Sequence, residues 1–367
     1  MSKSKSTVNH LKPSITALLT VVMLVVTFTV LASAEYVSNA ASVNYNVYYG
    51  SLHNHSNVSD GTGTPAQAYA YARDTAGLDF FALADHAESI SSTEWTSIKN
   101  AADTYNQDGT FVALHGFEWS HSTYGHVAVI NTTDYCKSTS LATNTFSELI
   151  TWLSSRNCVA FFNHPGRQDS IGSEFNHFST TPSSKFVGME LWNKNDPFTT
   201  YYYNDGYYPN DGSKGYFDEA NTRRWKVGAA GAHDNHSGTW GTENDYRLAI
   251  LATAKTRASI YEALQNRRFF TTLDKNITLS LEISGSQMGS TISAGTYDAV
   301  IKAGDGNSEV FSEVKLFKNG TAIYTWTPNS TNPVITQSLT TSTGDYYYIK
   351  VKQADGNEAI SSPVYIQ

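Results

Sequence analysis

The sequence contains few cysteines, few charged residues and no excess of basic residues. Its 367 residues include only two cysteines, too few for a disulfide framework or a thiolate zinc site. The net charge of −8 argues against a nucleic-acid scaffold, which needs a basic surface. With 40% hydrophobic and 16% charged residues, the chain is also unlike disordered, collagen-like or coiled-coil proteins. We therefore expect a globular protein with a large core and a smaller additional module.

Only one hydrophobic run is long, and it lies near the N-terminus. Three lysines precede the apolar run 15–31, and the small residues Ala-Ser-Ala follow at 32–34. This order predicts that residues 1–34 are a secretory signal peptide and that the protein is secreted or displayed on the cell surface. An uncleaved anchor helix is the alternative, since the run is almost long enough to span a bilayer. Contact with a membrane is expected only through this segment, before cleavage.

Export bears on the cysteines and on two glycosylation sequons. In an oxidising compartment Cys136 and Cys158 either form a disulfide or stay separate thiols, and the sequence leaves both open. The sequons at Asn57 and Asn235 fall inside histidine-containing motifs. Glycans would crowd those motifs, which favours a bacterial route of export without N-glycosylation.

Residues 45–273 alternate between short apolar runs and amphipathic stretches. The alternation predicts an α/β fold with a parallel sheet, and about eight units favour a barrel. An open doubly wound sheet is the alternative, but no glycine-rich phosphate loop follows the first strand. The expected strands are 47–52, 79–84, 110–117, 126–130, 158–162, 186–192, 226–230 and 248–253. Helix starts are indicated at Thr64-Pro65, at Ser91 with Glu94, at Thr145 with Glu148, and at Thr256.

Residues 276–367 follow a different pattern, in which apolar and polar residues alternate with a period of two. Asn319-Gly320 lies between two such runs and predicts a two-residue hairpin, and Asp355-Gly356 predicts another turn. We expect a small C-terminal β-sandwich of the immunoglobulin-like kind. Within the expected barrel region, the tyrosine-rich stretch 201–217 is interpreted as a long loop.

Histidines and acidic residues follow the expected barrel strands. Alone, each motif is more typical of ordinary surface or core, but strand ends of a barrel converge on one face. Buried imidazoles and carboxylates that converge without an ion would leave charge uncompensated. This donor set suits zinc, iron or manganese, and nine ligands imply two to three divalent ions. The candidate ligands are His53, His55, Asp60, His86, Glu118, His126, His164, Asp234 and His236.

Taken in order, these motifs resemble those of the PHP (polymerase and histidinol phosphatase) superfamily. The resemblance covers roughly residues 48–272, and the exported layout is most similar to metallohydrolases related to carbaryl hydrolase. It implies a distorted seven-stranded (β/α) barrel with three metal ions, so that one of the eight expected strands is not a stave. The motifs are Leu52-His53-Asn54-His55-Ser56 with Ser59-Asp60-Gly61, Leu83-Ala84-Asp85-His86, Gly116-Phe117-Glu118, Gly125-His126-Val127, Asn163-His164-Pro165 and Asp234-Asn235-His236.

The same resemblance implies how the ligands divide among the ions. One ion would be held by His53, His55, Glu118 and Asp234. Glu118 would bridge to a second ion, held with His126 and His164. The third would be held by Asp60, His86 and His236.

Other polar residues near these motifs are expected to act without binding metal. Asp85 is expected to orient an imidazole, and His233 to be a supporting group or a competing ligand. His121 is a candidate proton donor, with a solvated histidine as the alternative. Arg167 is a candidate catalytic and substrate-binding cation, with Lys194 a weaker one, because a guanidinium suits phosphate; a surface salt bridge is the alternative for Arg167.

Together these features predict an exported hydrolase that uses a metal-activated hydroxide on a small-molecule ester, most simply a phosphate ester. One alternative is a metallohydrolase for carboxylic or carbamic esters, which needs no anion clamp. The other is a non-catalytic surface or glycan-binding protein with structural metals.

Overall fold

The computed structural model describes residues 1–2, 44–167, 172–202 and 215–367. Asn44–Gln367 form one compact unit. The expected signal peptide, His10 and most of the expected loop 201–217 lie outside the described residues. Among the described helices, none is both long and apolar enough to cross a membrane.

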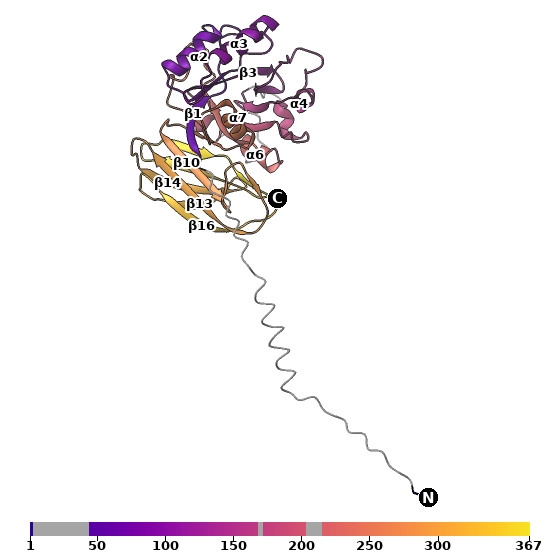
Figure 1. Cartoon of the computed structure of the whole chain (residues 1–367), viewed down its shortest axis with the longest axis vertical. Helices are drawn as coiled ribbons and strands as arrows, with labels where there is room; N and C mark the ends of the chain where they lie inside the picture. Colours follow the sequence, from indigo (N-terminus) through magenta and orange to yellow (C-terminus); the bar gives the residue numbers. More distant parts are fainter. Residues whose placement is uncertain (3–43, 168–171, 203–214) are drawn as a thin grey trace. The chain divides into compact units, whose positions relative to one another are not determined.

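One large curled sheet organises the first two thirds of this unit (Figure 1). Its neighbouring strands run in the order β9-β8-β1-β2-β3-β4-β5-β6-β7, and β7 also contacts β9. The eight expected strands are all confirmed as β1 to β8. The bounds are β1 Asn46–Ser51, β2 Phe80–Leu83, β3 Val112–His121, β4 Gly125–Ile130, β5 Val159–Asn163, β6 Phe186–Asn193, β7 Gly228–Ala232, β8 Arg247–Ala252 and β9 Phe269–Thr272.

The sheet is mixed, so the expectation of a parallel sheet was wrong for part of it. Strands β1, β2 and β3 are parallel, as are β5, β6 and β7. In contrast, β4 is antiparallel to both of its neighbours, and β8 is antiparallel to β1. The connection 122–124 between β3 and β4 has room for a tight turn only, whereas a parallel pair needs a crossover of a dozen or more residues.

Helices cover the outside of the sheet, and the predicted helix starts are confirmed. Thr64 and Ser91 each cap a helix through a reciprocal capping box, and Thr145 and Thr256 each accept a backbone N–H three residues on. The helices are α2 Pro65–Asp74, α3 Ser92–Tyr105, α4 Phe146–Ser154, α5 Phe198–Tyr201, α6 Tyr216–Thr222 and α7 Arg257–Gln265, with the 3-10 turn η1 Glu174–Phe178.

The remaining strands form two layers around a second core. One layer is the sheet β11-β10-β13-β16. Aliphatic residues of β10 and β13 pack against those of β14 and β17 in the other layer. The bounds are β10 Ile277–Ile283, β11 Ser286–Gln287, β12 Thr291–Ile292, β13 Thr296–Asp305, β14 Phe311–Lys318, β15 Thr321–Trp326, β16 Val334–Thr340, β17 Tyr346–Gln353, β18 Glu358–Ser361 and β19 Val364–Ile366.

Both predicted turns of this region are confirmed, and one strand pair joins it to the large sheet. Asn319 and Gly320 have φ of 52° and 79° and link the antiparallel strands β14 and β15. Asp355-Gly356 lies between the paired strands β17 and β18. Because β18 also pairs with β9, one sheet runs through both parts. The domain limits 45–273 and 276–367 stay predictions.

The two cysteines are separate in this structure. Cys136 and Cys158 are both buried free thiols, so the disulfide alternative is not realised. Burial raises the pKa of Cys136 to about 12 and that of Cys158 to about 11. Both therefore behave as small apolar side chains rather than as nucleophiles.

Candidate metal centre

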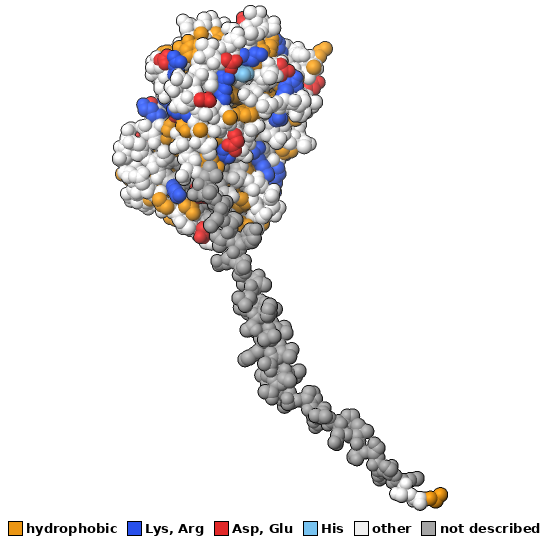
Figure 2. All heavy atoms as spheres, viewed as in Figure 1, with side chains coloured by type: hydrophobic (Ala, Val, Ile, Leu, Met, Phe, Trp, Pro, Cys, Tyr) orange, Lys and Arg blue, Asp and Glu red, His pale blue; other side chains and the backbone are white. Residues whose placement is uncertain are grey.

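The nine candidate ligands form one contiguous cluster. They come from the segments after β1, β2, β5 and β7 and from strands β3 and β4, and each has a nitrogen or oxygen within 4 Å of another member. On the face drawn in Figure 2, charged side chains of both signs are interspersed. Five of the nine ligands are buried: His53, His55, Glu118, His164 and Asp234. Sequence positions 53 to 236 thus converge in space, as the order of motifs predicts.

Glu118 lies at the centre of the cluster and is fully buried. Burial opposes its ionisation, but the neighbouring imidazoles, His53 first, hold the pKa of this carboxyl well below its usual range. Its Oε1 lies 3.1 Å from His53 Nε2, 3.3 Å from His126 Nδ1 and 3.4 Å from His164 Nε2, and its Oε2 lies 2.7 Å from His86 Nδ1 and 3.9 Å from His55 Nε2. A carboxylate with neighbours on both oxygens is suited to bridge two ions.

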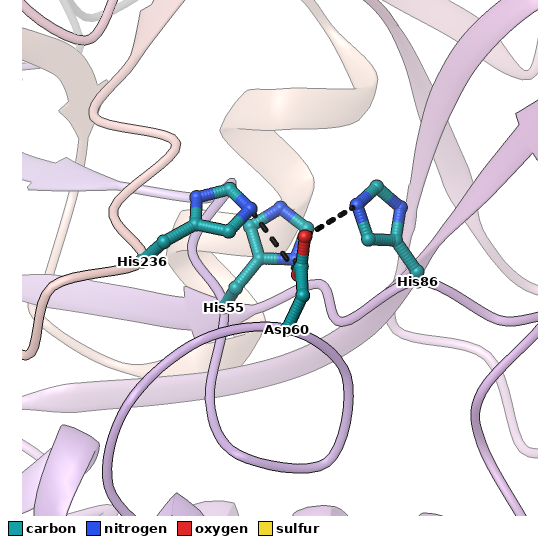
Figure 3. A group of neighbouring side chains, drawn as sticks. All are labelled: His55, Asp60, His86 and His236. Atoms are coloured by element: carbon teal, nitrogen blue, oxygen red, sulfur yellow. Dashed lines mark ion pairs between the residues drawn. The ribbon is translucent and has the colours of Figure 1, made fainter.

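A second group surrounds Asp60, at the open side of the cluster (Figure 3). Its carboxylate lies among three imidazoles, 3.3 Å from His236 Nε2, 3.6 Å from His86 Nε2 and 3.7 Å from His55 Nδ1. The Asp60 side chain is 58% exposed, whereas that of His55 is fully buried. These four residues offer ligand atoms within 4.8 Å of one another. The group contains the three residues expected for the third ion and adds His55.

Asp234 carries the third part of the cluster. Its Oδ1 lies 3.1 Å from His55 Nε2 and 3.4 Å from His53 Nε2. On its other side, Oδ2 accepts a hydrogen bond of 3.0 Å from Arg167 Nη1 and lies 3.7 Å from Lys194 Nζ. The two expected positively charged residues, Arg167 and Lys194, therefore both contact the cluster through the carboxylate of Asp234. Which residue holds which ion stays a prediction.

Arg167 is fixed from three directions. Besides Asp234, its Nη2 donates to Asn193 Oδ1 at 2.6 Å and to the Tyr201 hydroxyl at 2.7 Å. Its side chain is still 30% exposed. A guanidinium held in this way is oriented before any ligand arrives, which lowers the entropy cost of binding an anion.

The backbone is strained at two ligands of this cluster and at the neighbouring Lys194. His164, Lys194 and Asp234 have φ of 25°, 55° and 43°. Residues other than glycine rarely adopt such values, at a cost of about 1–3 kcal/mol each. Strain of this kind is typical of positions where a side chain must be aimed at a functional site.

Sequence reasoning missed Glu190, which supports the cluster from within β6. Its Oε1 lies 2.8 Å from His53 Nδ1, and its Oε2 accepts from the His164 backbone N–H at 2.8 Å and from Asn193 Nδ2 at 2.7 Å. The available signal was a single acid inside the apolar run 186–192. Asn163 was also missed; its Nδ2 donates to Glu118 Oε1 at 2.7 Å.

Asp85 supports the cluster indirectly, through Ser56 and Ser59. Its carboxylate accepts from the backbone N–H and hydroxyl of both Ser56 and Ser59 at 2.8–3.2 Å. Ser59 Oγ in turn lies 3.3 Å from His55 Nδ1. Asp85 thus fixes the loop that carries Asp60.

Two of the expected histidines are directed away from the ligands. His233 lies with its Nε2 2.9 Å from the Tyr246 carbonyl oxygen, and burial lowers its pKa to about 3. His121 stacks on Trp119, and its Nδ1 accepts the backbone N–H of Thr123 at 3.0 Å. Neither belongs to a candidate metal-binding group of the described residues. The proton-donor role of His121 stays a prediction.

The donor set fits divalent cations for a reason visible at His53. Because Glu190 accepts from Nδ1, the Nε2 of a neutral His53 ring carries a lone pair. That lone pair faces Glu118 Oε1, Asp234 Oδ1 and His55 Nε2, which lies 3.1 Å away. Burial by itself would lower the pKa of His53. The carboxylates of Glu118, Asp234 and Glu190 outweigh burial and hold this pKa well above its ordinary value. A divalent cation satisfies the same carboxylates and lets the imidazoles stay neutral.

A cavity of about 520 Å³ lies beside this cluster rather than inside it. Gly63 and Ser237 line it, a few residues after Asp60 and just after His236, together with Tyr71 of α2 and Trp240. None of the nine candidate ligands lines the cavity. The assignment of a metal site therefore depends on the side-chain chemistry of the cluster, and this cavity does not bear on it.

Comparisons with known proteins give the following similarities. Residues 80–157 match a protein family of unknown function, DUF3604. An uncharacterised protein of Chlamydia pneumoniae is 23% identical over 363 residues, covering 88% of this chain and 57% of that protein. One from Chlamydia muridarum is 21% identical over 358 residues, covering 87% and 57%. The chain thus spans little more than half the length of the curated relatives it matches.

Among solved structures, a two-domain protein of Bacteroides vulgatus is similar over 86% of this chain and 95% of its own. It is described as containing a predicted PHP-like metal-dependent phosphoesterase, and the identity is 16% with a TM-score of 0.47. A modular endo-β-1,4-mannanase of Cellulomonas fimi is 10% identical with a TM-score of 0.19, covering 79% of this chain and 48% of that chain.

Proposed function

We propose that this protein is an exported metal-dependent phosphoesterase of the PHP type, built on a distorted seven-stranded (β/α) barrel and acting on a small-molecule phosphate ester. The observation that carries the proposal is the environment of Glu118, a buried carboxylate with five imidazoles within 4 Å. The ordered motifs of the sequence support it independently.

Two to three zinc, manganese or iron ions would be held by the nine ligands. Such ions lower the pKa of water and stabilise negative charge on a phosphoryl group. Glu190 fixes the ring of His53 through Nδ1, and Asp85 holds the loop of Asp60 in place. The chain's own contribution is thus a set of ligands that hydrogen bonds hold in place before substrate binds.

Arg167 supplies the group that recognises phosphate. Asp234, Asn193 and Tyr201 orient its guanidinium beside the cluster, where it can donate to the oxygens of a phosphoryl group. Lys194, 3.7 Å from Asp234, adds a second positive charge. Two cations at one edge of a metal cluster favour an anionic substrate.

One observation favours the second candidate, hydrolysis of a carboxylic or carbamic ester, as in the carbaryl-hydrolase relatives that the motifs resemble. Arg167 already forms an ion pair with Asp234, which offsets part of its charge. A neutral ester needs no anion clamp, so a partly neutralised Arg167 would suffice as a structural group. The two functions differ in whether turnover depends on this side chain.

The proposal is tested by metal analysis and by a panel of phosphomonoesters, phosphodiesters and carboxyl esters. We expect two to three metal equivalents, loss of turnover on chelation, and about a 10³-fold loss in Glu118→Gln. Glu313→Gln, a surface acid paired with Lys315, is the matched control and should keep full activity. Less than one equivalent of metal in folded protein, or retained turnover in Glu118→Gln, would falsify the proposal.

A further inference from the structure

A second group of carboxylates lies far along the chain from the histidine cluster. Asp274 follows β9, Asp305 ends β13, and Glu309 lies between β13 and β14. Carboxylate oxygens of all three lie within 4.8 Å of one another. Asp274 is only 6% exposed. Three segments of the chain thus place like charges together at the junction between the large sheet and the two-layered region.

The Arg247 guanidinium attracts Asp274 at longer range, but none of the three carboxylates has a directly paired cation among the described residues. Among the residues that the structure describes, no lysine, arginine or histidine forms an ion pair with any of the three carboxylates. The nearest lysine in sequence, Lys275, pairs with Asp245 instead. Burial and the hydrogen-bonded Asp274 carboxyl raise the pKa of Glu309, as expected where like charges crowd one another. Despite the repulsion, backbone hydrogen bonds hold the Asp305 carboxylate in this position. They come from the N–H groups of Asn307 and Glu309, at 2.7 and 3.0 Å.

An independent observation points to a ligand at this position. Gln353, at the end of β17, is fully buried, and its Nε2 donates to Asp305 Oδ2 at 3.0 Å. Its Oε1 is buried as well and has no hydrogen-bond partner. An unpaired buried acceptor costs about 1–3 kcal/mol. The amide beside the carboxylates therefore lacks a positively polarised partner for its oxygen.

A hard cation would offset the repulsion between the carboxylates and take the Gln353 amide oxygen as a ligand. Calcium takes carboxylate oxygens and the side-chain carbonyl of Asn or Gln as ligands, and tolerates irregular geometry. The amide nitrogen and oxygen of Gln353 exchange places by a half-turn of the side chain. With a cation between Gln353 and Asp305, the half-turned amide directs its oxygen to the ion instead of its N–H to the carboxylate.

We propose that Asp274, Asp305, Glu309 and Gln353 form a calcium-binding site that joins the segment after β9 to the β13–β14 loop and to β17. The donors are all oxygen, whereas the cluster around Glu118 is rich in imidazole, so the two sites select different ions. The affinity expected for such an exported module is about 10⁻⁴–10⁻³ M. The site stabilises the junction and is separate from the proposed hydrolysis.

The experiment titrates full-length protein with CaCl2 and follows the thermal midpoint and the heat of binding. Wild type should gain thermal stability as calcium rises, because the ion binds only the folded state. Asp305→Asn should lose this gain while still folding, since Gln353 Oε1 then accepts from the new amide after its half-turn. Glu309→Gln should weaken the calcium response without removing the Gln353 contact.

Asp298→Asn is the matched control, because Asp298 is an exposed acid on the same strand. Its calcium response should equal that of wild type. The proposal is overturned if wild type shows no thermal shift and no binding heat up to about 10 mM calcium, ten times the weakest expected dissociation constant. It is also overturned if Asp305→Asn responds to calcium as strongly as Asp298→Asn. Turnover of Asp305→Asn should equal that of wild type, so a failure here is distinguishable from a failure of the proposed hydrolysis.

Discussion

The strands of the large sheet and those of the C-terminal layers bury their side chains in different ways. Strands β2, β8 and β9 are buried at every position. Strand β10 alternates between buried and more exposed residues, and β16 follows a similar rhythm. The first pattern is that of strands covered on both faces and the second that of strands with one wet face.

This difference in burial determines where functional polar side chains can gather. A strand buried on both faces can carry polar side chains at little cost only at its ends or where they meet one another, so histidines and acids gather at the ends of β1, β2, β5 and β7. An alternating strand directs most of its polar residues to water along its length, so that few of them converge. Substitutions at the strand ends should therefore change function, and those in the C-terminal core should change stability.

The largest expected effect is at the strand ends. Arg167→Ala should lower phosphoesterase turnover about 10²–10³-fold, because a preoriented donor to the phosphoryl oxygens is lost. The free energy of unfolding should also fall, because Asp234, Asn193 and Tyr201 lose a hydrogen-bond donor, so turnover is compared per folded molecule. Initial rates on a phosphomonoester, with Arg223→Ala as the control for loss of a surface arginine, measure the effect.

The same variant separates the two candidate functions. A carboxyl ester hydrolysed at the same centre should lose little turnover in Arg167→Ala, since it needs no anion clamp. An equal loss on both substrate types would show that Arg167 acts by holding Asp234, not by binding phosphate. Arg167→Lys, which keeps the charge but not the fork of donors, should fall between wild type and alanine.

In the C-terminal core the expected effect is on stability alone. Leu281→Ala in β10 removes a fully buried side chain and should lower the free energy of unfolding by about 3 kcal/mol through the cavity it leaves. Turnover per folded molecule should be unchanged. Denaturant unfolding against Thr278→Ala, an exposed residue of the same strand, tests this. A loss of turnover in folded Leu281→Ala would contradict the separation of the two regions.

The sequence predicts the strand positions and the membership of the histidine cluster, because both depend on local patterns. Apolar runs mark β1 to β8, and the polar residue after each run marks a strand end. Strand direction is less accessible: β4 is antiparallel because the link 122–124 is short, a feature visible in the sequence only once the ends of both strands are known. The pairing of β9 with β18 depends on tertiary contacts and has no local signal.

The supporting residues were harder to predict than the ligands. Glu190 occupies the middle of a buried strand, where an acid has no reason to lie unless it has a partner; that oddity was present in the run 186–192. His233 is the opposite case, a residue that the sequence singles out but that belongs to no candidate metal-binding group of the described residues. Its place beside Asp234 suggested a role at the metal site, yet successive residues along an extended segment face opposite ways. The structure places its Nε2 beside the Tyr246 carbonyl oxygen.

The smallest expected effect concerns His115. This histidine belongs to β3 but not to the metal-binding cluster, so its substitution should affect stability and not turnover. Its Nε2 lies 2.9 Å from the Thr132 carbonyl oxygen. Burial lowers its pKa, and nearby Arg257 and Lys99 act in the same direction while Asp103 and the hydrogen bond oppose them. The unfolded chain therefore binds a proton more readily than the folded one, so this residue costs stability as pH falls below its ordinary pKa of about 6.5.

His115→Gln retains an N–H donor for Thr132 but does not titrate. The thermal midpoint of wild type should therefore fall more steeply than that of the variant between about pH 7 and pH 5.5. Both proteins keep the histidine cluster, so the difference between their two curves isolates the single imidazole. Turnover should be the same in both at neutral pH. If the curves run parallel, His115 is equally basic in the folded and unfolded chain, and burial at this position does not act on its charge.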